Sequence, residues 1–163
     1  LLEMQQENTK AMLERITDEA LVDALADICQ APLPASIVEE TGRQMYSEQM
    51  LDMQMSGAMD MATLEKIASE EMVEKFLVES KDEIEKIVRR TVACEELFRL
   101  ESIEVSEEEF KNEVVAAKQE FEKYGTEYDV QRLVEQAVET IEARKSLEWL
   151  RANATVEVLP PAN

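Results

Sequence analysis

The stretch SEEEFKNEVVAAKQEFEKYG, from Ser106 to Gly125, carries the signals that decide the fold. Ser106 with Glu109 three residues later forms a capping box, in which each side chain bonds the other residue's backbone N–H and starts a helix. Behind the box, apolar residues recur at alternating spacings of four and three, namely Phe110, Val114, Ala117, Phe121 and Tyr124. Gly125 suits the left-handed position that ends a helix. We therefore predict a helix here, with one apolar seam that needs a partner helix.

A second helix is predicted to begin near Asp129. Its apolar stripe is dense, with Val130, Leu133, Val134, Ala137, Val138 and Ile141. The stripe falters at Arg144 and Lys145 and resumes at Leu147. Because only a short loop separates the two helices, we expect an antiparallel hairpin, or arm, over about 106–152. Residues 154–163 are predicted to form a C-terminal tail.

Upstream of the hairpin, apolar periodicity predicts a helix from about Thr9 to Ile28. Pro32 and Pro34 end it, because proline cannot continue a helix and forces the preceding residue towards an extended conformation. The next helix is expected from about Ala35 to Met55 and is interrupted near Ser56 and Gly57.

A further helical region is predicted from near Asp60 to about Ile103. Ser80 and Glu83 fit another capping box, so a kink or restart is expected at Ser80. With only three Gly and four Pro in 163 residues, and 45% hydrophobic residues, helix is favoured along most of the chain. The predicted fold is all-α: an elongated multi-helix domain over residues 1–153 with arm-like helical hairpins.

The formal net charge is −20, from 37 acidic and 17 basic side chains. Such a surface repels the phosphates of nucleic acids and of anionic membranes, so neither is expected as a partner. No run of about 18 apolar residues is long enough to span a membrane. The charge serves solubility, and an attraction to basic polypeptides is the alternative interpretation.

Groups that carry enzyme chemistry are missing from the sequence. The chain has no His, which excludes a His-based triad or metal ligand, and its three Gly are too scattered for a phosphate-binding loop. Cys29 and Cys94 lie among apolar helical residues and are expected to be buried thiols in a reducing compartment. We predict no catalytic residue, no metal site and no cofactor.

One segment of the chain is unusually rich in methionine. Six of the nine methionines fall between Met45 and Met61. The candidate substrate-binding residues are Met45, Tyr46, Met50, Leu51, Met53, Met55, Met59 and Met61. On a helix they occupy most of the circumference, where a helix packed on one side needs only a stripe. Either they are adaptable core filler, or they form a surface whose unbranched side chains fit many apolar sequences.

Several motifs, taken in order, resemble a known family. LPASIVEE from Leu33 to Glu40, RRTVACEEL from Arg89 to Leu97 and IEVSEEE from Ile103 to Glu109 are similar to segments of the trigger-factor C-terminal domain. The order of elements, with two arm helices and a short tail, continues as in that family over nearly the whole chain. The Met-rich segment departs from the bacterial pattern and favours a plastid-type member, in the chloroplast stroma, over a bacterial cytoplasmic one.

The resemblance implies an ATP-independent chaperone domain that holds unfolded or nascent polypeptides. It also implies that ribosome docking and prolyl isomerisation belong to other domains of the parent protein, so this segment is not expected to be an enzyme. Two alternatives remain open from the residues. The hairpin seams could pair with one dedicated partner helix, or the chain could be part of an enzyme whose catalytic domain lies elsewhere.

Overall fold

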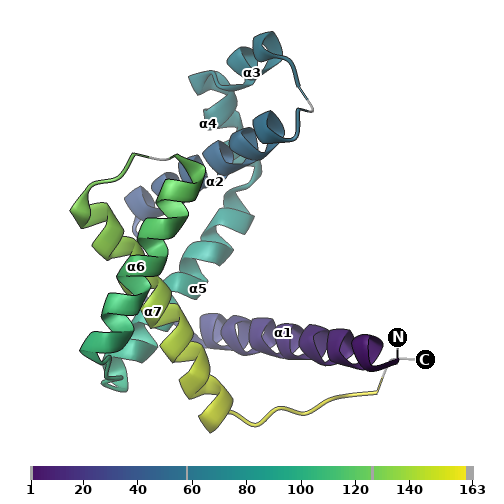
Figure 1. The fold of residues 1–163 in the computed structure, drawn as a ribbon, viewed down its shortest axis with the longest axis vertical. Coiled ribbons are helices and arrows are strands. Elements are labelled where there is room, and N and C mark those ends of the chain that lie inside the picture. Colours follow the sequence, from purple (N-terminus) through teal and green to yellow (C-terminus); the bar gives the residue numbers. More distant parts are fainter. Residues whose placement is uncertain (1, 58, 126, 161–163) are drawn as a thin grey trace. The chain divides into compact units, whose positions relative to one another are not determined.

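The computed structural model describes residues 2–57, 59–125 and 127–160, without the side chains of Leu2, Met61 and Tyr124 (Figure 1). Its helices are α1 (Leu2–Ile28), α2 (Ala35–Met55), α3 (Met61–Ile67), α4 (Glu70–Glu79), α5 (Lys81–Leu100), α6 (Glu107–Tyr124) and α7 (Val130–Asn153). No strand occurs among the described residues. The predicted all-α fold with helical hairpins is therefore confirmed.

The chain divides into two compact units. One combines Leu1–Cys29 with Ala93–Asn163, and the other is the continuous segment Gln30–Val92. The boundary falls inside α5, whose first part belongs to the second unit and whose last part belongs to the first.

In the first unit, α6 and α7 pair as the predicted hairpin (Figure 1). The capping box is present, since the Ser106 hydroxyl accepts from the Glu109 amide and the Glu109 carboxylate accepts from the Ser106 amide. Gly125 ends α6 in the left-handed conformation, with φ 63°, and Asp129 caps α7 by accepting from the Arg132 amide. The inward side of the hairpin is apolar and buried, with Ala117, Leu133, Ala137 and Ile141.

Helix α1 packs against α7 through its C-terminal half. Arg151 donates two hydrogen bonds to the Asp18 carboxylate, at 2.8 and 2.5 Å, and Ala26 is buried. The part of α1 that precedes Asp18 keeps Met4, Met12, Leu13 and Ile16 exposed.

In the second unit, α2 packs against α4. The close approach depends on Gly42, which is buried on α2. A Cβ at this position would overlap the Leu77 side chain and would lie 2.8 Å from Ile84 Cδ1. The absence of a side chain at residue 42 thus lets Leu77 and Ile84 fill the space against α2.

The observed helices differ from the predicted ones in two places. Helix α1 begins at Leu2 instead of Thr9, because its first turns are rich in Glu, Gln and Met, which favour helix. The region after Asp60 breaks at Ala68 and Ser69 as well as at Ser80. Ser69 is extended, with φ −70° and ψ 148°, and Glu70 and Glu71 follow in the first turn of α4, where acidic side chains favour the helix dipole.

Helix α7 is continuous where the apolar stripe falters. Lys145 Nζ lies 2.9 Å from Glu109 Oε1, and Arg144 Nη2 lies 3.9 Å from Glu113 Oε2, so both cations reach α6. The two charged residues therefore interrupt the hydrophobic pattern without interrupting the helix, since they cross-link the hairpin.

Candidate functional site

The second unit contains a groove of about 430 Å³. Helix α2 supplies one wall, and α3, the α3–α4 junction and the start of α4 supply the other. The lining residues are Tyr46, Ser47, Met50, Leu51, Gln54, Leu64, Glu65, Ala68 and Val73. Most of these side chains are apolar, and the polar ones carry no positive charge.

Tyr46 fixes the position of α3 and α4 against α2. Its hydroxyl donates a short hydrogen bond to the backbone carbonyl of Ile67, the last residue of α3. Its ring packs on Phe76 of α4, with centroids 5.1 Å apart and planes tilted by 51°. A tilted ring pair at this separation is a favourable aromatic geometry. One side chain of α2 thus holds both opposing helices.

Arg43, one turn before Tyr46, makes a second link. Its Nη2 lies 2.6 Å from Glu70 Oε1 at the start of α4, and its Nε lies 3.1 Å from Glu39 Oε1. The hydrogen bond to Glu70, followed by the bond to Glu39, raises the pKa of Arg43, and the bond from Arg43 lowers the pKa of Glu70. Because these groups are exposed, the pairs add little stability, but they orient the first turn of α4.

A turn joins α2 to α3, the two helices that face each other across the groove. Ser56 ends α2, and Gly57 adopts φ 63°, a conformation that glycine takes without strain. Asp60 then caps α3 by accepting from the Thr63 amide at 2.8 Å. The side-chain and backbone hydrogen bonds from Thr63 lower the pKa of Asp60.

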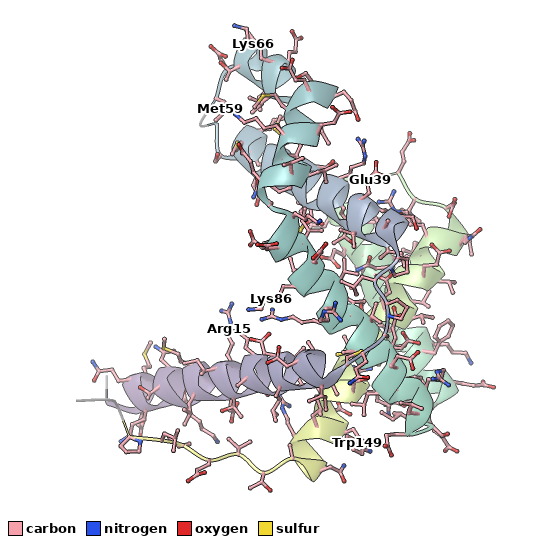
Figure 2. All side chains as sticks on the ribbon, turned by 180° about the vertical axis from the view of Figure 1, so that it is seen from behind. Arg15, Glu39, Met59, Lys66, Lys86 and Trp149 are labelled. Atoms are coloured by element: carbon pink, nitrogen blue, oxygen red, sulfur yellow. The ribbon has the colours of Figure 1, made fainter. Side chains whose placement is uncertain are left out.

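The predicted site residues are partly brought together by this fold. Tyr46, Met50 and Leu51 line the groove. Met45 and Met53 are half-buried on α2 outside its lining. Met55 and Met59 are exposed, at 66% and 37%, and Figure 2 shows Met59 in the turn that leads from α2 to α3. Met61 is the first residue of α3, and its side chain lies outside the described residues.

The opposing wall contains residues that sequence reasoning did not select, chiefly Leu64 and Val73. Finding them requires the break between α3 and α4, because an unbroken helix would not fold back beside α2. The available signal was Ser69 followed by Glu70 and Glu71, a typical helix start.

The groove offers mainly apolar contact. No group of three or more His, Cys, Asp or Glu side chains in the described part of the chain is placed to hold a metal ion. Cys94 is buried, and desolvation, with a smaller contribution from Glu95, raises the pKa of its thiol, so it is a poor nucleophile. Cys29 is half-buried.

The apolar seams of the α6–α7 hairpin are buried by contacts within the chain itself. Ala117, Leu133 and Ala137 are buried in the first unit, so these seam positions are already covered. Other apolar residues of the hairpin, such as Val115 and Val130, are exposed and do not belong to these buried seam positions. None of the helices that the structure describes has an apolar stretch long enough to traverse a bilayer.

The described part of the chain thus consists of paired helices, with a mainly apolar groove in the second unit. The family described as "Bacterial trigger factor protein (TF) C-terminus" matches residues 2–158, and the chain belongs to this family of chaperones. The part that matches is the chaperone part of trigger factor and not a catalytic domain.

Similar proteins come from plants and cyanobacteria. "Trigger factor-like protein TIG, Chloroplastic" of Arabidopsis thaliana is 31% identical over 154 residues, which cover 94% of this chain and 28% of that protein. "Trigger factor" of a Synechococcus strain is 30% identical over 143 residues, covering 88% of this chain and 29% of that protein. The chain thus spans under a third of the length of these relatives.

Proposed function

We propose that this chain is an ATP-independent chaperone domain that holds unfolded or nascent polypeptides. The observation that carries the proposal is the groove of about 430 Å³ beside α2, with Tyr46, Met50 and Leu51 in one wall and Leu64 and Val73 in the other. Apolar surface that stays accessible in a folded domain commonly marks an interaction site.

The mechanism is the burial of an apolar side chain of the client in the groove. Each such side chain gains at most about 1.5–3 kcal/mol, so one contact gives weak, reversible binding. Met55 and Met59 are exposed outside the groove lining and offer further apolar surface, and their unbranched side chains adapt to different client sequences. Release then needs no ATP, because folding of the client removes the exposed residues that bind.

Two groove substitutions test the proposal. Met50→Glu with Leu51→Gln places a charge and an amide in the wall, and we expect loss of protection of a thermally denatured test enzyme from aggregation. Val115→Gln on α6, where Val115 is 54% exposed in the first unit, is the matched control and should leave protection unchanged. Circular dichroism checks that each variant is folded. Undiminished protection by the groove variant would show that clients bind elsewhere.

The domain boundaries follow from the same proposal. Residues 1–153 would form the chaperone domain, with the arm at about 106–152, and residues 154–163 the tail. Ribosome docking and prolyl isomerisation would belong to parts of the protein outside these residues. A purified fragment that catalyses prolyl isomerisation of a test peptide would contradict this division.

The proposed compartment is reducing, either the chloroplast stroma or a bacterial cytoplasm. The plant relative is named as chloroplastic, and the other relatives cited are cyanobacterial, which supports a plastid-type member. Fractionation of the source cells with an antibody against this domain tests the assignment, and a signal confined to a secreted fraction would refute it.

A further inference from the structure

One methionine lies in the groove wall, and two exposed methionines follow it along the chain. Met50 is part of the groove wall. Met55 lies four residues after Leu51, so the two project from the same side of α2, and Met55 is 66% exposed. Met59, 37% exposed, lies in the turn that joins α2 to α3 (Figure 2). These three residues are called the groove methionines below.

Accessible thioethers react with peroxides. The sulfur lone pair attacks one peroxide oxygen, a sulfur–oxygen bond forms and the oxygen–oxygen bond breaks. Sulfur loses two electrons to the peroxide, and the departing oxygen takes up a proton and leaves as water or an alcohol. The product is methionine sulfoxide, which is polar and which dedicated reductases convert back to methionine.

Oxidation at these positions would make the surface that binds apolar segments more polar. Leu51, Leu64 and Val73 lie in the same lining as Met50, so a sulfoxide there would introduce a strong acceptor into a mainly apolar contact. A polar group covered by an apolar ligand without a hydrogen bond is unfavourable. The hydroxyl of Tyr46, also in the lining, already donates to the Ile67 carbonyl.

We propose that the groove methionines form an oxidation-sensitive site, at which peroxides convert Met50, Met55 and Met59 to sulfoxides and thereby weaken the binding of apolar segments. The proposal rests on the proposed chaperone function and adds its regulation. Reduction with a dithiol and the two stereospecific sulfoxide reductases restores the groove. In that step the oxygen leaves as water, and the dithiol becomes a disulfide.

The first unit provides a matched set of methionines. Met4 and Met12 on α1 are exposed at 68% and 66%, close to the value for Met55. They should be oxidised as readily as Met55, since exposure governs access of the oxidant. Only the groove methionines should couple that oxidation to ligand binding.

The experiment compares three proteins: the unsubstituted chain, the variant Met50→Leu/Met55→Leu/Met59→Leu, and the variant Met4→Leu/Met12→Leu. Leucine keeps the apolar volume but cannot form a sulfoxide. Each protein is treated with hydrogen peroxide, and oxidised positions are identified by peptide mass spectrometry. Binding of a fluorescent, permanently unfolded polypeptide is measured by anisotropy before oxidation, after it, and after enzymatic reduction.

We expect the untreated unsubstituted chain and the untreated α1 variant to bind the probe, and the effect of peroxide on each protein is measured against the affinity of that same protein before treatment. Peroxide should weaken binding about tenfold for the unsubstituted chain and for the α1 variant, and reductases should restore it. The affinity of the groove variant, whatever its value before treatment, should not change with peroxide or with the reductases. Equal losses in the groove variant, unchanged binding by the oxidised chain, or resistance of the groove methionines to oxidation would overturn this inference alone. Absence of binding before oxidation would instead refute the proposed function.

Discussion

The hydroxyl of Ser146 on α7 donates a hydrogen bond of 2.9 Å to the backbone carbonyl of Cys94 on α5, and the Ser146 residue is completely buried. A polar side chain in that position needs a partner, because an unpaired buried hydroxyl is costly. Lys145 beside it pairs with Glu109 on α6. Two successive residues of α7 thus connect three helices of the first unit.

Ser146→Ala should destabilise the chain by about 1 kcal/mol, the usual net contribution of one hydrogen bond. Ser146→Val should cost more, about 1–3 kcal/mol, since extra methyl groups overfill a closed space. Urea unfolding followed by the fluorescence of Trp149, the single tryptophan, measures both changes. Ser36→Ala on the exposed face of α2 is the control and should stay within about 0.5 kcal/mol of the parent. Equal stabilities for the Ser146 and Ser36 variants would contradict the role of the bond.

Gly42→Ala tests the close packing in the second unit. Alanine favours helix by about 1 kcal/mol over glycine. The new Cβ, however, would overlap Leu77 and crowd Ile84, which is only 1% exposed and has little room to move. Because overpacking costs about 1–3 kcal/mol, the net change should be destabilising.

The double variant Gly42→Ala/Ile84→Val separates crowding from other causes. Removing Cδ1 of Ile84 deletes the atom that the new Cβ would meet at 2.8 Å. The double variant should therefore be more stable than the sum of the single changes predicts, with a coupling of at least about 0.5 kcal/mol in equilibrium unfolding. Additive effects would mean that Leu77 alone, or the backbone, absorbs the crowding.

Local chemistry allowed much of the fold to be predicted from sequence. Ser106 with Glu109, and then Gly125, set the ends of α6 through contacts within a few residues, so the pattern was sufficient. The same holds for α2, whose limits follow from Pro34 and from Ser56 with Gly57. In each case the signal and the structure involve the same short segment.

The groove could be predicted only in part, because it depends on contacts distant in sequence. Tyr46 stood out in the Met-rich segment, but its bond to Ile67, 21 residues away, decides where α3 lies. Nothing in the sequence around Leu64 indicates whether this residue lines a groove or belongs to the core. The methionines lie around most of the circumference of α2, so they differ in exposure: Met53 is half-buried, whereas Met55 on the same helix is exposed.

Tyr46→Phe should loosen α3 while keeping the ring contact with Phe76. The variant loses the hydrogen bond to the Ile67 carbonyl, so the α3 amides should exchange with deuterium faster, by about fivefold for a bond of about 1 kcal/mol. Tyr128→Phe is the control, because the Tyr128 hydroxyl lies 3.5 Å from Glu122 in the first unit. Unchanged exchange of α3 in Tyr46→Phe would show that the ring alone holds the helix.

Two carboxylates of the first unit should give opposite pH dependences of stability. The hydrogen bond from Lys145, with those from Ser106, lowers the pKa of Glu109 from 4.5 to about 2. Its ionised form therefore stabilises the fold above pH 4.5, and that contribution is lost as the pH falls towards 2. Glu109→Gln should be less stable than the parent at pH 7, and the difference should shrink at acidic pH.

Ionisation of Glu142 has the opposite effect on stability to that of Glu109. Desolvation, then repulsion from Glu95 and Glu139, raises its pKa above 4.5, so its ionised form opposes folding at neutral pH. That penalty disappears as the pH falls below 4.5, where the carboxyl is protonated in both the folded and the unfolded chain. Glu142→Gln should thus raise the free energy of unfolding at pH 7 and leave it unchanged near pH 3. Unfolding curves of the parent, Glu109→Gln and Glu142→Gln across this range measure both effects, and variants that shift in the same direction at pH 7 would contradict the assigned environments.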